Sequence, residues 1–116
     1  MKKRLLTIIA SLTLIFALLL SGCGVDQKMA DKINEKVNAE GGYTSAQLLQ
    51  DYKNPTLGGL DPITGSGLYV YVDGCETKDE ADQKYKNGEE INAVYVYVAF
   101  NKVTSAKYKK YSPNES

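Results

Sequence analysis

The most regular pattern in the chain is an alternation of tyrosine and valine that occurs twice. Tyr-Val-Tyr-Val stands at positions 69–72 and again at positions 95–98. Such alternation is typical of a β-strand, because successive side chains of a strand point to opposite faces. We therefore predict two strands here. Two strands alone make a marginal sheet, so we expect residues 103–111 to add a third strand or, alternatively, a short helix.

A different periodicity predicts a helix over residues 26–40. Met29, Ile33 and Val37 recur every fourth position, which places them on one face of a helix, and two glycines follow at positions 41 and 42.

Two more helices are indicated by their first turns. Thr44 is followed three residues later by Gln47, and Thr77 by Glu80. In this capping box the two side chains satisfy backbone N–H groups at the start of a helix. We expect a short helix from Thr44 and another over residues 78–87.

The segments between these elements leave the topology open. Residues 53–67 hold two prolines and four glycines, so we predict a long loop there. The connection between the two repeats is long enough for a parallel crossover, but an antiparallel pair is also possible. The predicted fold class is α+β: a small single domain in which two or three strands carrying the repeats pack with two or three short helices.

The tyrosines of the repeats are the candidate binding residues. If the valines of both strands face the core, the tyrosines share the opposite face. Tyrosine combines a large apolar ring with a polar tip and is enriched in binding surfaces. The alternatives are that a helix, such as residues 26–40, covers the rings, or that they form ordinary cross-strand pairs. The four predicted ligand-facing residues are Tyr69, Tyr71, Tyr95 and Tyr97.

The start of the chain predicts export. A basic cluster at residues 1–4 precedes residues 5–20, which carry no charge. This layout is typical of a secretory signal peptide. A membrane-spanning helix is the alternative, but the run ends in small residues and lacks a following basic cluster.

The end of this apolar run, Leu20-Ser21-Gly22-Cys23, resembles the lipobox of bacterial lipoproteins. The resemblance implies that diacylglycerol is attached to the Cys23 thiol and that a peptidase cuts between Gly22 and Cys23. It also implies that the new N-terminus can be acylated. The expected organisation is a signal peptide at 1–22, a lipid-anchored helix at 23–42 and a small α+β domain at 43–112.

Net charge and residue content limit the classes of partner and of chemistry that this chain can be expected to have. Cleavage would remove three of the 14 basic residues and none of the 14 acidic ones, which leaves a net charge of about −3 and disfavours nucleic acid as a partner. Lipidation of Cys23 would leave Cys75 without a disulfide partner in the chain. The chain has no histidine, which excludes Ser-His and Cys-His catalysis and imidazole zinc sites. We expect no enzymatic activity, no cofactor and no metal.

The expected function is that of a membrane-anchored extracytoplasmic lipoprotein, acting as a noncatalytic binding or interaction module. Its expected partners are the membrane, through the lipid on Cys23, and an unidentified protein, peptide or glycan. One alternative is an immunity or phage-exclusion lipoprotein. Another is the precursor of a peptide pheromone, because the released signal peptide would end in IFALLLSG, which resembles enterococcal sex-pheromone peptides.

Overall fold

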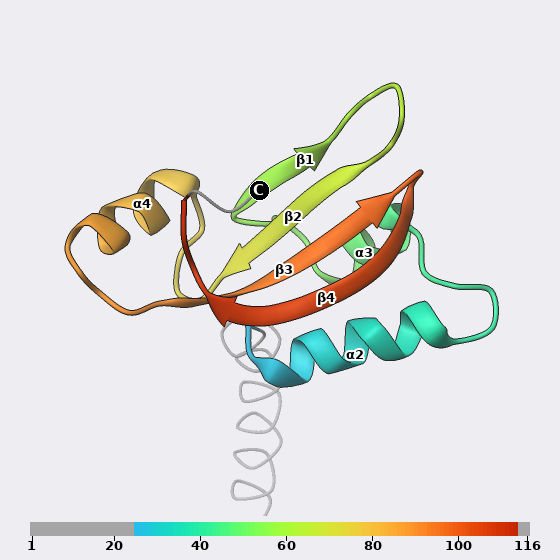
Figure 1. The fold of residues 1–116 in the computed structure, drawn as a ribbon, viewed down its shortest axis with the longest axis horizontal. Helices are drawn as coiled ribbons and strands as arrows, with labels where there is room; N and C mark the ends of the chain where they lie inside the picture. The colour runs from blue at the N-terminus through green and yellow to red at the C-terminus, as the bar shows by residue number, and fades with distance from the viewer. Residues whose placement is uncertain (1–24, 114–116) are drawn as a thin grey trace, which may run out of the picture.

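A four-stranded antiparallel sheet forms the centre of the computed structural model, which describes residues 25–113 (Figure 1). The predicted α+β class is confirmed, with four strands in place of two or three. In chain order the elements are α2 (Gln27–Asn38), α3 (Ser45–Asp51), β1 (Leu57–Leu60), β2 (Gly67–Val72), α4 (Lys78–Lys86), β3 (Asn92–Ala99) and β4 (Lys102–Lys110).

The strands lie in the sheet in the order in which they occur in the chain, and each neighbouring pair is antiparallel. The two Tyr-Val repeats therefore pair antiparallel, although α4 lies between them in the sequence. The chain leaves β2 and returns to β3 at the same end of the sheet, where the Asp73 N–H donates to the Asn92 carbonyl at 2.9 Å. Helix α4 occupies this connection, beside that end of the sheet (Figure 1).

Each helix of residues 25–113 begins directly after a capping residue. The carboxylate of Asp26 accepts a hydrogen bond from the Met29 N–H at 2.9 Å, which caps α2. Both predicted capping boxes form, at Thr44 and at Thr77. These side chains satisfy N–H groups that have no partner inside the helix, which fixes each starting point.

Strand β1 is absent from the prediction, which assigned residues 53–67 to a loop. Two of the four glycines that suggested a loop, Gly58 and Gly67, are required by strand pairing instead. Gly58 has φ +104° and lies so close to the Leu68 carbonyl oxygen that a Cβ atom would collide with it. A Cβ atom on Gly67 would collide with the Gly59 carbonyl oxygen in the same way. Glycine here marks close approach of two backbones.

Residues 103–111, left open between strand and helix, belong mainly to strand β4, which lies at an edge of the sheet. Its outer side is covered by α2 and, at its first residues, by an antiparallel bridge between Thr44 and Lys102, where the Val103 N–H donates to the Tyr43 carbonyl at 2.8 Å. The side-chain amide of Asn34 in α2 donates to the Ala106 carbonyl at 2.9 Å and accepts from the Ala106 N–H at 2.8 Å. A side chain thus supplies the pairing that a neighbouring strand would provide, and it blocks further strand addition there.

Side chains are buried on both faces of the sheet. The face under α2 and α3 carries what we call the helix-side core: Met29, Ala30, Ile33, Tyr43, Leu48, Tyr71, Val94, Val96, Val98, Val103 and Ala106. The other face carries the far-side core: Val70, Val72, Cys75, Ala81, Ala93, Tyr95 and Tyr111.

The turn between β3 and β4 has an unusual backbone. Ala99 pairs with Lys102, so Phe100 and Asn101 form a two-residue loop, and their φ angles are +50° and +65°. Two-residue hairpin loops of this kind favour asparagine or glycine, because a Cβ atom is strained at positive φ. A bulky phenylalanine at such a position is an outlier.

We predict that Phe100→Asn raises the stability of the domain by about 1 kcal/mol, because asparagine tolerates positive φ. For a domain of this size the melting temperature should rise by roughly 4–8 °C. Thermal melts measure the change. Phe100→Ala is the matched control, since it removes the ring but keeps a Cβ atom. If the alanine variant gains as much as the asparagine variant, backbone strain is not the cause.

Candidate functional site

The predicted lipidation and cleavage residues, Gly22 and Cys23, lie outside the described residues, so both assignments stay predictions. The described chain starts two residues later, at Val25, which already packs against the helix-side core. Asp26 then caps α2. Each residue spans at most about 3.6 Å, so Val25, where the described chain begins, follows Cys23 by about 7 Å of chain at most.

The four candidate tyrosines do not share a face, and that expectation is wrong. In the register of β2 with β3, Tyr69 lies opposite Val96 and Tyr71 opposite Val94. Directly paired residues project from the same face of a sheet. Tyr69 and Tyr71 therefore lie on the helix side. Alternation shows which residues share a face within one strand, but not how two strands are aligned.

Tyr95 and Tyr97 lie on the far side, opposite Val70 and Leu68 respectively. Lys109 Nζ sits 4.6 Å from the ring centroid of Tyr95, and Lys107 Nζ sits 6.0 Å from that of Tyr97. Tyr95 is only 1% exposed, and its hydroxyl accepts a hydrogen bond from the Ser112 N–H at 3.1 Å. It therefore belongs to the core.

Tyr71 is likewise a core residue, with 5% of its surface exposed. Its hydroxyl donates to the Tyr52 carbonyl at 2.6 Å, and the two rings meet edge to face with centroids 6.3 Å apart. Tyr69 and Tyr97 are half-buried, one on each face. The predicted continuous tyrosine surface is therefore not present.

An open cleft of about 910 Å³ is the main concave feature considered as a candidate site. It lies at the end of β2, beside the start of α2. Segments far apart in the sequence build it: the start of α2, the stretch after α3, the end of β2 and the turn before α4. The side chains lining its apolar part include Val25, Met29, Tyr52, Tyr71, Val72 and Cys75.

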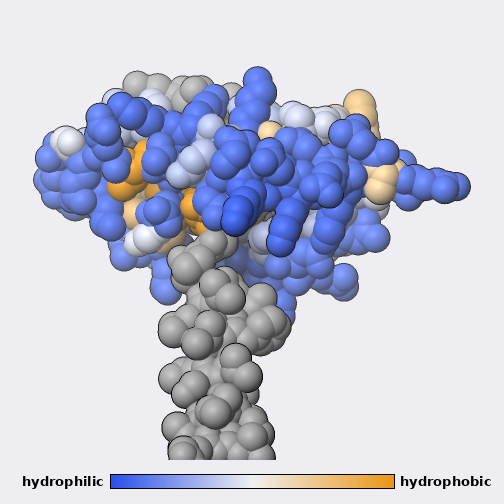
Figure 2. All heavy atoms as spheres, turned by 90° about the horizontal axis from the view of Figure 1, so that it is seen from below, coloured by the Kyte–Doolittle hydropathy of each residue, from blue (hydrophilic) through white to orange (hydrophobic). Residues whose placement is uncertain are grey.

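Polar groups surround this apolar part. The buried Thr56 hydroxyl donates to the Cys75 carbonyl at 2.8 Å and accepts from the Val72 N–H at 2.9 Å. It thereby joins the segment before β1 to the end of β2. Charged side chains at the rim include Asp51, Lys53, Asp73 and Glu76. Seen from below, the surface is mostly hydrophilic, with small hydrophobic areas between polar side chains (Figure 2).

Cys75 is the only thiol in the described part of the chain, and it is 7% exposed. Burial raises the pKa of the thiol, with nearby acidic groups adding to the effect and Lys84 opposing it. Reactive cysteines need a lowered pKa instead. Cys75 therefore contributes packing at the cleft.

Hydrogen bonds to carboxylates fix two other tyrosines near the helices. The Tyr43 hydroxyl donates to Asp51 at 2.6 Å, and Lys36 contacts the same carboxylate oxygen at 2.7 Å. The hydrogen bond from Lys36, followed by that from Tyr43, lowers the pKa of Asp51. On the far side, Tyr111 donates to Asp82 of α4 at 2.7 Å. Each bond ties a helix to a neighbouring segment and has a structural role.

Residues 25–113 contain no cluster of three or more side chains suited to hold a metal ion. Over the same residues, no helix has both the length and the apolar character that crossing a membrane requires. Comparisons with protein-family models, with curated proteins and with solved structures find no match.

Most of the cleft was not foreseen from the sequence, because it is assembled from several connecting segments. Thr56 gave no signal, since it lies in the segment interpreted as a loop. Val25 did carry one, because an apolar residue just before a helix cap commonly packs back onto the helix as a hydrophobic staple.

Alkaline pH should destabilise the domain through its buried phenols. Burial raises the pKa of Tyr71, Tyr43 and Tyr111 above the ordinary value of 10.0. Because the folded-state pKa values are raised, the folded state favours the neutral phenols. The resulting stability is complete below about pH 10 and is lost as pH rises above it.

We predict that Tyr71→Phe lowers stability at neutral pH, by about 1 kcal/mol for the lost hydrogen bond to Tyr52. The variant should also lose less stability than the wild type between about pH 8 and about pH 11. Thermal melts across that range measure both effects. Tyr85→Phe, at a residue 44% exposed on α4, is the control and should follow the wild type. Parallel pH curves for wild type and Tyr71→Phe would contradict the assignment.

Proposed function

We propose that this chain is a membrane-anchored lipoprotein of the extracytoplasmic side, and that its domain is a noncatalytic binding module. The anchor is supported by the basic start, the uncharged run at 5–20 and the lipobox-like Leu20-Ser21-Gly22-Cys23. Each buried CH₂ of a lipid contributes about 0.8 kcal/mol, and two acyl chains hold a protein firmly on a membrane.

The observation that best supports this proposal is the position of Val25, which connects the proposed anchor to the cleft. It lies two residues after Cys23, packs against the helix-side core and lines the cleft. With so short a connection, a lipid on Cys23 holds the cleft next to the bilayer surface. The ligand would then be a protein, peptide or glycan that occurs at that surface.

The make-up of the cleft supports binding rather than catalysis. Aromatic and aliphatic side chains with a few polar groups are typical of ligand pockets. The Thr56 hydroxyl is held between two backbone groups, and the Cys75 thiol has a raised pKa. Neither group is arranged as a nucleophile with a neighbouring base.

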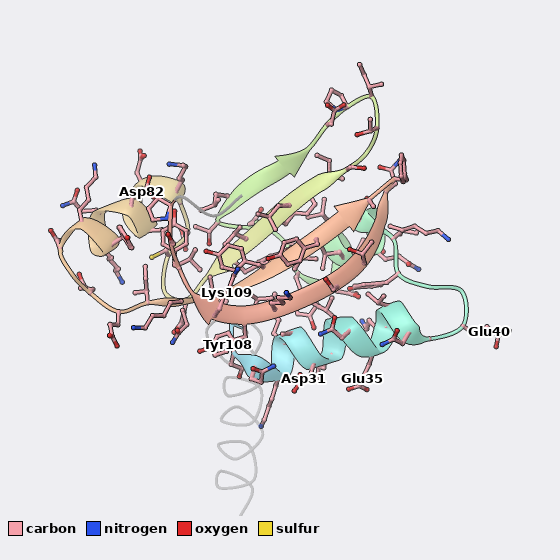
Figure 3. All side chains as sticks on the ribbon, in the orientation of Figure 1. Asp31, Glu35, Glu40, Asp82, Tyr108 and Lys109 are labelled. Atoms are coloured by element: carbon pink, nitrogen blue, oxygen red, sulfur yellow. The ribbon has the colours of Figure 1, made fainter. Side chains whose placement is uncertain are left out.

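The net negative charge of the expected mature chain disfavours a nucleic-acid partner. Asp31 and Glu35 project from α2 away from the sheet (Figure 3), and the expected mature chain has a net charge of about −3. Nucleic-acid binding depends mainly on clustered lysine and arginine contacting phosphates.

We predict that Cys23→Ala abolishes lipidation and cleavage in the bacterial host, because the modification takes place on the Cys23 thiol. Mass spectrometry of the membrane-extracted protein should show acyl mass on a wild-type chain that starts at Cys23. The variant should keep Met1 and carry no acyl group.

Cys75→Ala is the matched control, because it removes the other cysteine of the chain. It should be lipidated and processed like the wild type. A Cys23→Ala chain that still gains acyl mass, or a Cys75→Ala chain that loses it, would overturn the anchor assignment.

A further inference from the structure

Two turns of the chain are joined at the end of the sheet that lies away from the cleft. Residues 61–66 connect β1 to β2, and Phe100 and Asn101 connect β3 to β4 (Figure 1). The Asn101 N–H donates to the Gly65 carbonyl at 2.8 Å, and the Phe100 N–H donates to the Ser66 hydroxyl at 3.0 Å. We call these two turns together the tip.

The tip presents two large apolar side chains to solvent. Ile63 is 92% exposed and Phe100 is 76% exposed. Among the described residues, the only other exposed large hydrophobic side chain is that of Tyr85, which is 44% exposed and lies on α4. Two large apolar side chains exposed on turns that are hydrogen-bonded to each other indicate an interaction site more strongly than a single exposed residue does.

Both side chains project from turns whose backbone is held by hydrogen bonds. The Asp61 carboxylate accepts hydrogen bonds from the N–H groups of Ile63 at 2.7 Å and Thr64 at 3.1 Å, which fixes the first turn. The second turn is fixed to the first turn and to α3, since the Ser45 N–H donates to the Asn101 carbonyl at 2.9 Å. A preformed arrangement loses little conformational entropy when it binds.

The backbone strain at Phe100 also indicates that the tip is an interaction site. The ring is exposed, so it contributes little packing, and φ +50° disfavours a bulky residue. Asparagine or glycine at position 100 would adopt this backbone conformation with less strain. Strained conformations that bring no structural gain are concentrated at functional sites.

The shape and size of the tip favour a lipid surface as its partner. Two projecting side chains cover far less than the roughly 1,200 Å² buried in a small specific protein–protein interface. A bilayer, by contrast, accepts a projecting apolar group without a complementary pocket. The tip carries one exposed acidic and one exposed basic side chain, Asp61 and Lys102, so its net charge is zero and charge does not oppose contact with a lipid surface.

We propose that Ile63 and Phe100 insert into the interface of the same bilayer that holds the lipid on Cys23. This inference rests on the proposed function, because insertion of two side chains is weak alone and becomes effective when a lipid already tethers the chain. Strand β3 has eight residues and spans about 26 Å between the cleft end and the tip. The strands would then run along the membrane, with the domain attached at both ends.

The experiment uses tryptophan as a reporter of lipid contact, because the chain contains none. Full-length Phe100→Trp and Ile63→Trp proteins are expressed in the bacterial host, extracted from membranes and reconstituted into phosphatidylglycerol vesicles with and without brominated phosphatidylcholine. We expect a blue-shifted emission maximum for both reporters and a marked loss of intensity with the brominated lipid. Tyr85→Trp is the control reporter and should show neither.

Co-sedimentation of each protein with the vesicles separates the two proposals. If the Phe100→Trp and Ile63→Trp proteins sediment with vesicles while their emission stays unquenched, the insertion of the tip is overturned and the anchor is left intact. Equal quenching of all three reporters overturns it too, because the tip would have no special contact. A protein that does not sediment contradicts the anchor, and the insertion that rests on it falls as well.

Discussion

The register between β2 and β3 determines how both cores of this domain are filled. Each Tyr-Val-Tyr-Val repeat alternates large and small side chains, and the antiparallel pairing sets a tyrosine opposite an aliphatic residue at Tyr69–Val96, Val70–Tyr95 and Tyr71–Val94. Each of the two faces formed by β2 and β3 thus receives both tyrosine rings and smaller side chains. A shift of one residue would place rings opposite rings and valines opposite valines. Close packing disfavours that arrangement, because one face would then be crowded with rings while the other face would hold only the smaller valine side chains.

This register also explains why both faces of the sheet need cover. Each buried ring brings a hydroxyl that requires a partner. On the helix side, Tyr71 donates to the carbonyl of Tyr52, just after α3. On the far side, Tyr95 accepts from Ser112, which follows β4. The segments that follow α3 and β4 are thereby fixed onto the sheet, and the first of them forms one wall of the cleft.

Local signals in the sequence were sufficient to predict the helices. Thr44 and Thr77 mark helix starts through short-range hydrogen bonds, which depend only on neighbouring residues. The relative alignment of β2 and β3 depends on contacts between distant residues, so the tyrosine face could not be predicted from alternation. Strand β1 was missed for a similar reason: Gly58 signals a loop by composition, whereas its close approach to Leu68 exists only in the folded sheet.

The two ends of the sheet differ in a way that bears on function. The cleft end is reached by the chain directly after Cys23, and its apolar side chains are bordered by polar and charged groups. The other end exposes Ile63 and Phe100 on two turns that are hydrogen-bonded to each other. In the proposed arrangement a lipid holds the first end and apolar insertion holds the second. The cleft is then kept at the membrane surface in a fixed orientation.

The register can be measured directly by double-mutant cycles. Unfolding free energies from denaturant titration are compared for Tyr71→Leu combined with Val94→Ala, and for Tyr71→Leu combined with Tyr95→Leu. Tyr71 and Val94 lie opposite each other on one face, so we predict a coupling of about 0.5–3 kcal/mol. Tyr71 and Tyr95 lie on opposite faces, so their effects should add within about 0.5 kcal/mol. Strong coupling of Tyr71 with Tyr95, and none with Val94, would contradict the two-core account.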